Sequence, residues 1–288
     1  MLKTRGQRIF NWFNIVIVFI IMLTCLLPFI HVLAKALSSN TYILAKEVYF
    51  WPKGFTFFSF NYVLSNPQFM RSMLVSVYIT VAGTLLSMII TILTAFVFTR
   101  KDLPFQGFIV GLFIFTMFFG GGMIPTYLLY SNMGLLDTYA VLILPGAVGV
   151  FNIILMRNFF ESISPSLEES AIIDGASNIR VLFAIYVPLS KAAIATITLF
   201  FAVGKWNAYF NAVMYTTSPA KMPVQLYLRN ILLNLDTLLE SDPQQLEYVA
   251  TEGVRAATVV AAMLPILMVY PFAQRYFIHG MMIGAIKE

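Results

Sequence analysis

Six long apolar stretches divide the chain, and polar segments separate them. The stretches lie near residues 11–34, 72–98, 107–130, 139–159, 190–213 and 254–277. Each has about 20 residues or more, which is the length that a helix needs to cross roughly 30 Å of hydrocarbon. A backbone in lipid must satisfy its own hydrogen bonds, so the stretches predict helices, and the ten-residue alternation of a membrane barrel is not seen. The pattern therefore predicts an all-α integral membrane protein with six transmembrane helices.

Composition supports a membrane protein. The 288 residues are 59% hydrophobic and 11% charged, whereas soluble domains carry about 25% charged residues. The single Cys25 lies inside the first apolar stretch, so the sequence holds no disulfide framework. A net charge of +5 is compatible with nucleic-acid binding, but the basic residues are scattered between the apolar stretches. Membrane orientation is therefore the favoured explanation of the charge.

The first apolar stretch has two interpretations. Lys3, Arg5 and Arg8 precede it, as basic residues precede the apolar part of a secretory signal peptide. The stretch is too long for a signal peptide, however, and residues 35–37 make a poor cleavage site. We expect a retained transmembrane helix.

The distribution of Lys and Arg predicts the orientation, because these residues gather in cytoplasmic loops. They fall before the first stretch, between the second and third, between the fourth and fifth, and in the tail. The 214–253 segment is instead mainly acidic. We therefore expect cytoplasmic termini, external 38–70 and 214–253 segments and a cytoplasmic 161–188 loop. The expected organisation is an N-terminal helix with an external loop over 1–70, followed by a core of five helices over 71–288.

The 161–188 loop is expected to begin with a short helix. Ser164 is a plausible N-cap, and Pro165 suits the first helical position. Glu168 and Glu169 follow in the first turns, where carboxylates interact favourably with the helix dipole. Residues Ile163, Leu167 and Ala171 recur at spacings of four and predict one apolar face.

A bend and a second short helix should follow. Gly175 can take the left-handed conformation of a helix end, and we expect any side chain there to crowd a tight bend. Ser177 can cap a second helix through Ile185, which should end before Pro188. Such a loop is either an amphipathic segment resting on the membrane or a docking surface.

The spacing within this loop resembles a known signature. Glu169-x-Ala171-x3-Gly175-x9-Ile185-x2-Pro188 is similar to the motif of the permease subunits of binding-protein-dependent ABC importers. Ser170 and Val187 stand where that family usually has Ala and Leu. Asp174 and Ala176 match the form found in sugar importers. The resemblance implies a coupling helix that fits a cleft on the ATPase subunit, with the contact at Glu168, Glu169, Ala171, Asp174, Gly175, Ala176, Ile185 and Pro188.

Further segments extend the resemblance over about residues 70–285. Four further segments resemble parts of the carbohydrate-uptake permeases: residues 123–127, residues 134–138, Leu144–Pro145 and Trp206–Asn207. The chain resembles the shorter, six-helix subunit of these heterodimers, with a type I importer fold. The nearest resemblance is to the Bacillus-type subfamily that takes up complex oligosaccharides, including pectin-derived ones.

The resemblance also implies partners and a location. The expected partners are a second homologous permease, two copies of an ABC ATPase that bind ATP and magnesium, and an external solute-binding lipoprotein. The expected location is the bacterial plasma membrane, which the chain crosses several times. No nucleic acid is expected as a partner.

Polar residues of the fifth stretch are candidates for the translocation path. Lys205, Trp206, Asn207 and Asn211 offer amides and aromatic faces that suit a sugar. The alternatives are that the amides bond neighbouring helices and that Lys205 snorkels to the interface. The run of residues 120–122, all glycine, indicates either a broken helix at a transport site or close helix packing.

Catalytic motifs are not found. His31 and His279 form no metal motif, and no phosphate-binding Gly-x4-Gly-Lys loop occurs. No metal site, no cofactor and no catalytic residue of the chain's own is therefore expected. The remaining alternatives are a permease for another solute, such as an amino acid or polyamine, and a membrane enzyme or signalling anchor. An enzyme or anchor would need polar residues clustered near one interface, and none is visible.

Overall fold

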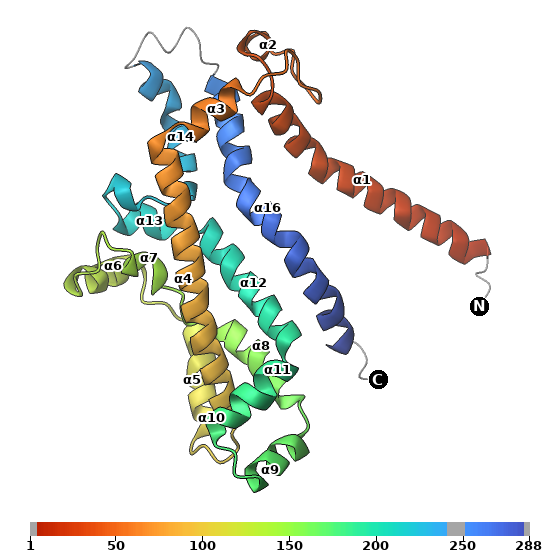
Figure 1. Cartoon of the computed structure of the whole chain (residues 1–288), viewed down its shortest axis with the longest axis vertical. Helices are drawn as coiled ribbons and strands as arrows, with labels where there is room; N and C mark the ends of the chain where they lie inside the picture. The colour runs from red at the N-terminus through yellow and green to blue at the C-terminus, as the bar shows by residue number, and fades with distance from the viewer. Residues whose placement is uncertain (1–4, 241–250, 285–288) are drawn as a thin grey trace. The chain divides into compact units, whose positions relative to one another are not determined.

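The computed structural model describes residues 5–240 and 251–284, and all regular elements of this part are helical (Figure 1). The elements from the N-terminal part of the chain to residue 118 are α1 (Arg5–Ala36), α2 (Asn40–Leu44), α3 (Phe58–Leu64), α4 (Pro67–Phe98) and α5 (Gln106–Phe118). Those of the middle are α6 (Met123–Asn132), α7 (Ala140–Ile143), α8 (Val150–Glu161), α9 (Pro165–Ile173), α10 (Asn178–Val181), η1 (Leu182–Tyr186) and α11 (Val187–Leu189). The last are α12 (Lys191–Asn207), α13 (Phe210–Tyr215), η2 (Pro219–Lys221), α14 (Val224–Glu240) and α16 (Thr251–Gly284).

The chain forms two compact units. The first comprises Met1–Met70 and Tyr227–Leu264, and the second comprises Arg71–Leu226 and Pro265–Glu288. In the first unit, a side-chain Cβ at Gly253 would lie 2.9 Å from Ser59 Oγ and 3.0 Å from Ile43 Cδ1. The glycine therefore allows α16 to approach α2 and α3 closely.

The core of the second unit joins five parts of the chain. Its buried side chains come from α4, α5, α8, the α10–η1 segment and α12. Phe160, Ile153 and Ile197 are among the most completely buried. A second cluster joins α7 and α13 to residues of α4 and α14, and Val141 and Ala212 are its most buried members. Consequently α12 and α13 contact separate cores, one on each side of the Asn207–Phe210 interval.

Within the described residues, three helices are long and apolar enough to cross a membrane on their own. They are Ile9–Ala36, Pro67–Phe98 and Thr251–Val269. Two further pairs pass the same test together but are sharply bent: Gln106–Phe118 with Met123–Asn132, at 110°, and Asn178–Leu189 with Lys191–Asn207, at 84°. The first, second and sixth apolar stretches thus form long helices, as predicted, while the other three do not form straight ones.

Glycine and proline explain two of the breaks. The α5–α6 bend falls at Gly120, Gly121 and Gly122, and nothing lies within 4 Å of a Cβ built at the first two. The structure therefore shows a broken helix at this run, as one of the two alternatives predicted. The 139–159 stretch was expected to be one helix, and this is wrong. Helix α7 ends at Ile143 and the next helix, α8, begins at Val150, because Pro145 and a left-handed Gly146 (φ +71°) interrupt the helical backbone between them.

Candidate functional site

The 161–188 loop begins with α9, which ends in a defined turn at Gly175. Ser164 and Pro165 take their predicted N-terminal places, although Ser164 Oγ bonds Ser166 Oγ at 2.8 Å instead of capping the helix. At the other end Gly175 adopts φ +78°, and its N–H donates to Ile172 O at 2.9 Å. The Ala176 N–H donates to Ala171 O, also at 2.9 Å. This pair of bonds is a Schellman motif, whose left-handed position favours glycine.

The space around Gly175 differs from the expectation. Nothing lies within 4 Å of a Cβ built at Gly175. The prediction that a side chain would crowd the bend is therefore wrong, and the requirement for glycine comes from the positive φ alone.

The second part of the loop continues further than predicted. Ser177 Oγ accepts a hydrogen bond from Arg180 N at 3.3 Å, so it caps α10 as expected. The helix does not end before Pro188, however, because η1 and α11 continue it to Leu189. The η1 segment is a π-helical turn, and Pro188 is the second residue after it, within α11.

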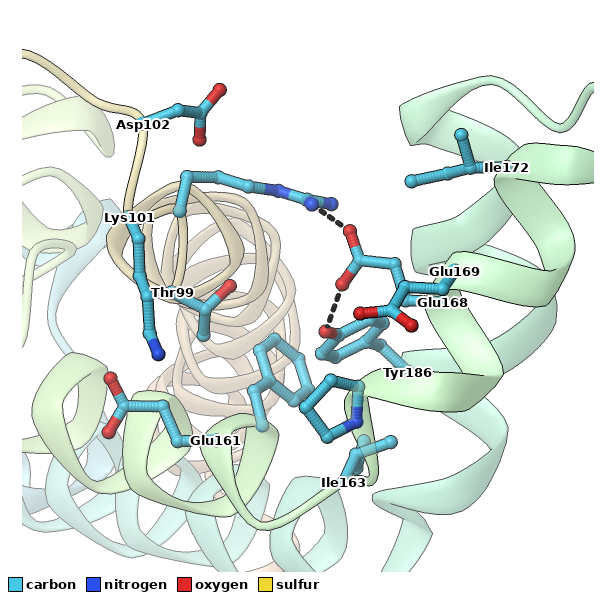
Figure 2. A pocket seen from close by; sticks show the side chains of 12 residues that line it. Thr99, Lys101, Asp102, Glu161, Ile163, Glu168, Glu169, Ile172 and Tyr186 are labelled. Atoms are coloured by element: carbon cyan, nitrogen blue, oxygen red, sulfur yellow. Dashed lines mark hydrogen bonds and ion pairs between the residues drawn. The ribbon is translucent and has the colours of Figure 1, made fainter.

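Glu168 points inward and connects three elements. Its Oε1 forms an ion pair with Arg100, which follows α4, and its Oε2 accepts a hydrogen bond from the Tyr186 hydroxyl at 2.6 Å (Figure 2). The Glu168 side chain is 16% exposed and that of Arg100 is 22% exposed. Water therefore screens this pair less than a surface pair.

Aromatic rings lie beneath the ion pair. The Arg100 guanidinium stands 4.2 Å from the centroid of the Phe96 ring. Tyr186 meets Phe96 and Phe160 edge to face, at centroid distances of 5.2 and 5.3 Å. These contacts add cation–π and aromatic interactions to the ion pair. The start of the loop is thereby fixed against α4 and α8.

A cavity of about 730 Å³ opens beside α9. Figure 2 shows Glu168 beside Tyr186, with Lys101, Asp102 and Glu161 around the same space. Its lining residues are Thr99, Arg100, Lys101, Asp102, Phe160, Glu161, Ile163, Pro165, Glu168, Glu169, Ile172 and Tyr186. Both acidic and basic groups line it, so its walls are polar at this end of the loop.

The structure divides the eight residues predicted for the ATPase contact into two groups. Glu168 bonds internally, and Ala171, Ala176 and Ile185 pack against the core. The remaining four are exposed: Glu169, Asp174, Gly175 and Pro188. The predicted apolar face holds for Ile163 and Ala171, whereas Leu167 is 47% exposed.

Several residues of this loop were not found by the sequence motif. Arg100 and Tyr186 bind Glu168 from positions 68 and 18 residues away along the chain. Ile173 and Ile179 are 85% and 71% exposed and add apolar area to the outer face. Isoleucines in a polar loop, outside the spacing of the inward face, were a usable signal for a docking surface.

A separate polar cluster forms around Asp137. Its Oδ1 accepts bonds from the Thr217 and Ser218 backbone amides at 3.1 and 3.0 Å. Its Oδ2 accepts from Ser218 Oγ at 2.5 Å and from Lys221 Nζ at 3.1 Å. The bonds from Ser218, and then that from Lys221, hold the pKa of Asp137 well below its usual range. The carboxylate thus fixes the segment between α13 and α14.

The candidate path residues lie at the end of α12. Because α12 ends at Asn207 and α13 begins at Phe210, Asn207 and Asn211 do not share one continuous helix face as predicted. Lys205 donates to Ile143 O at 2.8 Å and to Pro145 O at 3.0 Å, which excludes simple snorkelling in this structure. Trp206 is buried, and Asn207 is exposed.

The neighbourhood of Asn211 is small. Asn211 and Lys205 line a cavity of about 10 Å³, room for about one water molecule. Its other walls are Ser76, Ile79, Leu142, Ala208, Ala212 and Pro223. This cavity cannot itself hold a sugar.

Known proteins resemble the whole chain. No protein-family model matches it. Protein LplC of Bacillus subtilis is 41% identical over 100% of this chain and 98% of its own. The polygalacturonan/rhamnogalacturonan transport system permease protein YtcP of the same organism is 39% identical over 98% of this chain and 99% of its own. A solved chain of a bacterial ABC transporter involved in the import of the acidic polysaccharide alginate superposes with a TM-score of 0.91. It is 34% identical and covers 96% of this chain and 99% of its own.

The fold and these similarities define the class as the membrane permease subunit of an ABC importer. More particularly, the chain belongs to the carbohydrate-uptake permeases of these importers. Permeases of this kind are integral membrane proteins and not themselves enzymes.

Proposed function

We propose that the chain is a permease subunit that imports oligosaccharides released from acidic plant or bacterial polysaccharides, with pectin-derived uronates as the preferred class. The observation that carries the proposal is the full-length identity to a polygalacturonan/rhamnogalacturonan permease, at 39%. The likeness to a transporter for the acidic polysaccharide alginate supports the same substrate chemistry. The proposed location is the bacterial plasma membrane, with six spans and both termini in the cytoplasm.

The exposed face of the 161–188 loop is the proposed ATPase contact. Glu169, Asp174, Gly175 and Pro188 lie on it, and Ile173 and Ile179 add apolar area. Glu168 lies behind this face and holds it in position through Arg100 and Tyr186. When ATP draws the two ATPase copies together, the loop moves and the helices change access from one side to the other. ATP and magnesium are bound by the partner subunit.

The other proposed partners are those that the resemblance to the family implies. A second homologous permease completes the membrane part, and an external binding protein delivers the sugar to the 214–253 segment, of which residues 241–250 lie outside the described part of the structure. The Asp137 cluster supports this role, because it orders the 216–221 segment before any partner binds.

Lys205, Trp206, Asn207 and Asn211 are proposed to lie beside the translocation path. The helix breaks directly after Asn207, and interrupted helices expose backbone groups at transport sites. If Asn207 bonds a sugar hydroxyl, Asn207→Ala will leave complex yield unchanged but alter the ratio of uptake of two competing sugars. Equal loss of yield and transport, with an unchanged ratio, would instead make Asn207 a helix-packing residue.

The proposed substrate class is tested in vesicles that contain the full importer. ATPase activity is measured with the binding protein in the presence of an oligogalacturonide, a neutral maltooligosaccharide, an amino acid or a polyamine. The proposal expects stimulation and uptake with the oligogalacturonide. Uptake of only the amino acid or polyamine would refute it, and uptake of only the neutral sugar would refute the uronate class.

A further inference from the structure

The interruption in the 139–159 stretch is held by α12. The helix stops at Ile143 and resumes at Val150, so residues 144–149 form a break within an apolar stretch. Two α12 side chains one helical turn apart, Phe201 and Lys205, lie against the two ends of this break. In Figure 1 the lower end of α12 lies near α8, which α12 also contacts.

Lys205 holds the first end of the break. Its ammonium donates to Ile143 O at 2.8 Å and Pro145 O at 3.0 Å. These carbonyls lie where the helix has stopped, so no following helical turn provides donors for them. Among the described residues no carboxylate lies within ion-pair distance of Lys205. A charged group in a membrane is costly unless polar groups solvate it, and the two carbonyls do so here.

The side chains of Lys205 and Phe201 each pack against a glycine. A Cβ at Gly83 of α4 would lie 3.2 Å from both Cδ and Cε of Lys205, so the lysine stem lies against bare backbone. A Cβ at Gly149 would lie 2.9 Å and 3.0 Å from two ring carbons of Phe201. Phe201 therefore packs closely on the residue directly before α8. The break is fitted to α12 at both ends.

The same helix reaches the 161–188 loop. Ala193 and Ile197 of α12 are 1% and 0% exposed, in one core with Val181, Leu182 and Tyr186 of the loop. The 17 residues of α12 span about 25 Å at the usual helical rise. Although the chain bends by 84° between α11 and α12, α12 itself runs without interruption from the core that it shares with the loop to the break.

We infer that Phe201 and Lys205 are positioning residues through which α12 transmits movement of the 161–188 loop to the break at 144–149. The inference rests on the proposed ATPase contact of that loop. We expect the break to move with α12 only while Phe201 contacts Gly149 and Lys205 contacts the carbonyl groups of Ile143 and Pro145.

Lys205→Met tests the inference, because methionine keeps much of the stem but has no donor. The importer is reconstituted with its second permease, its ATPase copies and the binding protein loaded with an oligogalacturonide. Complex yield, ATPase stimulation and sugar transported per ATP hydrolysed are measured. We expect stimulation to persist while sugar per ATP falls about tenfold, a size typical of coupling changes. Unchanged sugar per ATP, or a loss of stimulation and transport in equal proportion, would overturn the inference.

Gly149→Ala provides an independent test if Lys205→Met fails to assemble. It removes no polar group but forces the Phe201 ring to shift, so sugar per ATP should fall again. Gly204→Ala on α12 is the matched control, because nothing lies within 4 Å of a Cβ there. A normal ratio in Gly149→Ala would overturn the inference. The ATPase contact itself is judged separately by stimulation in Glu169→Gln, where a normal value would contradict that proposal alone.

Discussion

Gly175 and Glu168 illustrate two different kinds of constraint on single residues. Gly175 is set by its own backbone conformation, so its place at a helix end could be predicted from the local sequence. Ser177 was predictable for the same reason. The partners of Glu168 were not, since Arg100 lies 68 residues away and meets it only through tertiary packing. The turn can therefore be predicted from neighbouring residues, whereas the contacts that stabilise it can be seen only in the folded structure.

Substitutions at Gly175 should follow backbone preference rather than size. A non-glycine residue in the left-handed region costs about 1–2 kcal/mol, and less for Asn, whose side chain can bond locally. We therefore expect the loss of coupled ATPase activity to be smallest for Gly175→Asn, larger for Gly175→Ala and largest for Gly175→Val. ATPase stimulation by loaded binding protein measures this. If Asn and Val were equally harmful, backbone conformation would not be the cause.

Glu168 and Glu169 form a matched pair for substitution by glutamine. Glu168→Gln loses the ion pair with Arg100, and we expect about 1.5–3 kcal/mol of stability to be lost, as for hydrogen bonds to charged groups. The melting temperature of the purified complex should therefore fall. Glu169→Gln changes an exposed group, so it should leave the melting temperature unchanged but weaken ATPase stimulation. Equal melting temperatures for both variants would show that the inward contact does not stabilise the loop.

Elements in this chain are interrupted more often than apolar periodicity indicates. The Pro145–Gly146 break and the continuation past Pro188 were both missed from sequence. In the first case, the continuous run of apolar residues gave no sign that α7 ends at Ile143, where Lys205 of α12 donates to the carbonyl groups of Ile143 and Pro145. In the second, a π-helical turn precedes Pro188, and α11 continues through the proline. The triple-glycine break was foreseen as one alternative, because glycine has no Cβ to favour the helix.

Asp137 should keep the 216–221 segment ordered over a wide pH range. Its folded pKa is lowered, so its stabilising contribution is present above the ordinary pKa of about 4 and is lost only as pH falls through the lower folded value. Hydrogen exchange of 216–221 should therefore be steady from neutral pH to about pH 5, after correction for the intrinsic exchange rate.

Asp137→Ala removes all the side-chain acceptors and should raise exchange in that segment at every pH. Glu47→Gln is the control, because it alters an ion pair with Lys53 in which both side chains are about half exposed. Such pairs contribute little. Slow exchange in Asp137→Ala would show that other contacts order the segment.

At the scale of the whole molecule, the charge distribution predicts which segments face the cell exterior. Glu47 lies in the proposed external 38–70 segment, and Asp102 lies in the proposed cytoplasmic turn after α4; both are exposed. In a Cys25→Ser background, an impermeant thiol reagent added to intact cells should label Glu47→Cys and not Asp102→Cys. Inside-out vesicles should reverse the pattern. Labelling of Asp102→Cys from outside would overturn the orientation.

On the proposed ATPase contact, the Glu168 contacts have a further consequence for how the importer assembles. A loop that is already folded does not lose its backbone freedom when a partner binds, and that freedom is worth about 1–2 kcal/mol for each residue fixed. With Glu168 bonded at both oxygens and the Schellman turn closed, much of this entropy has been lost during folding of the permease itself. Preorganisation of this kind favours tight association from a modest contact area. If the ATPase binds this loop as proposed, it meets a surface that is already folded, and a displacement of that surface is expected to reach α12 instead of being absorbed by a flexible loop.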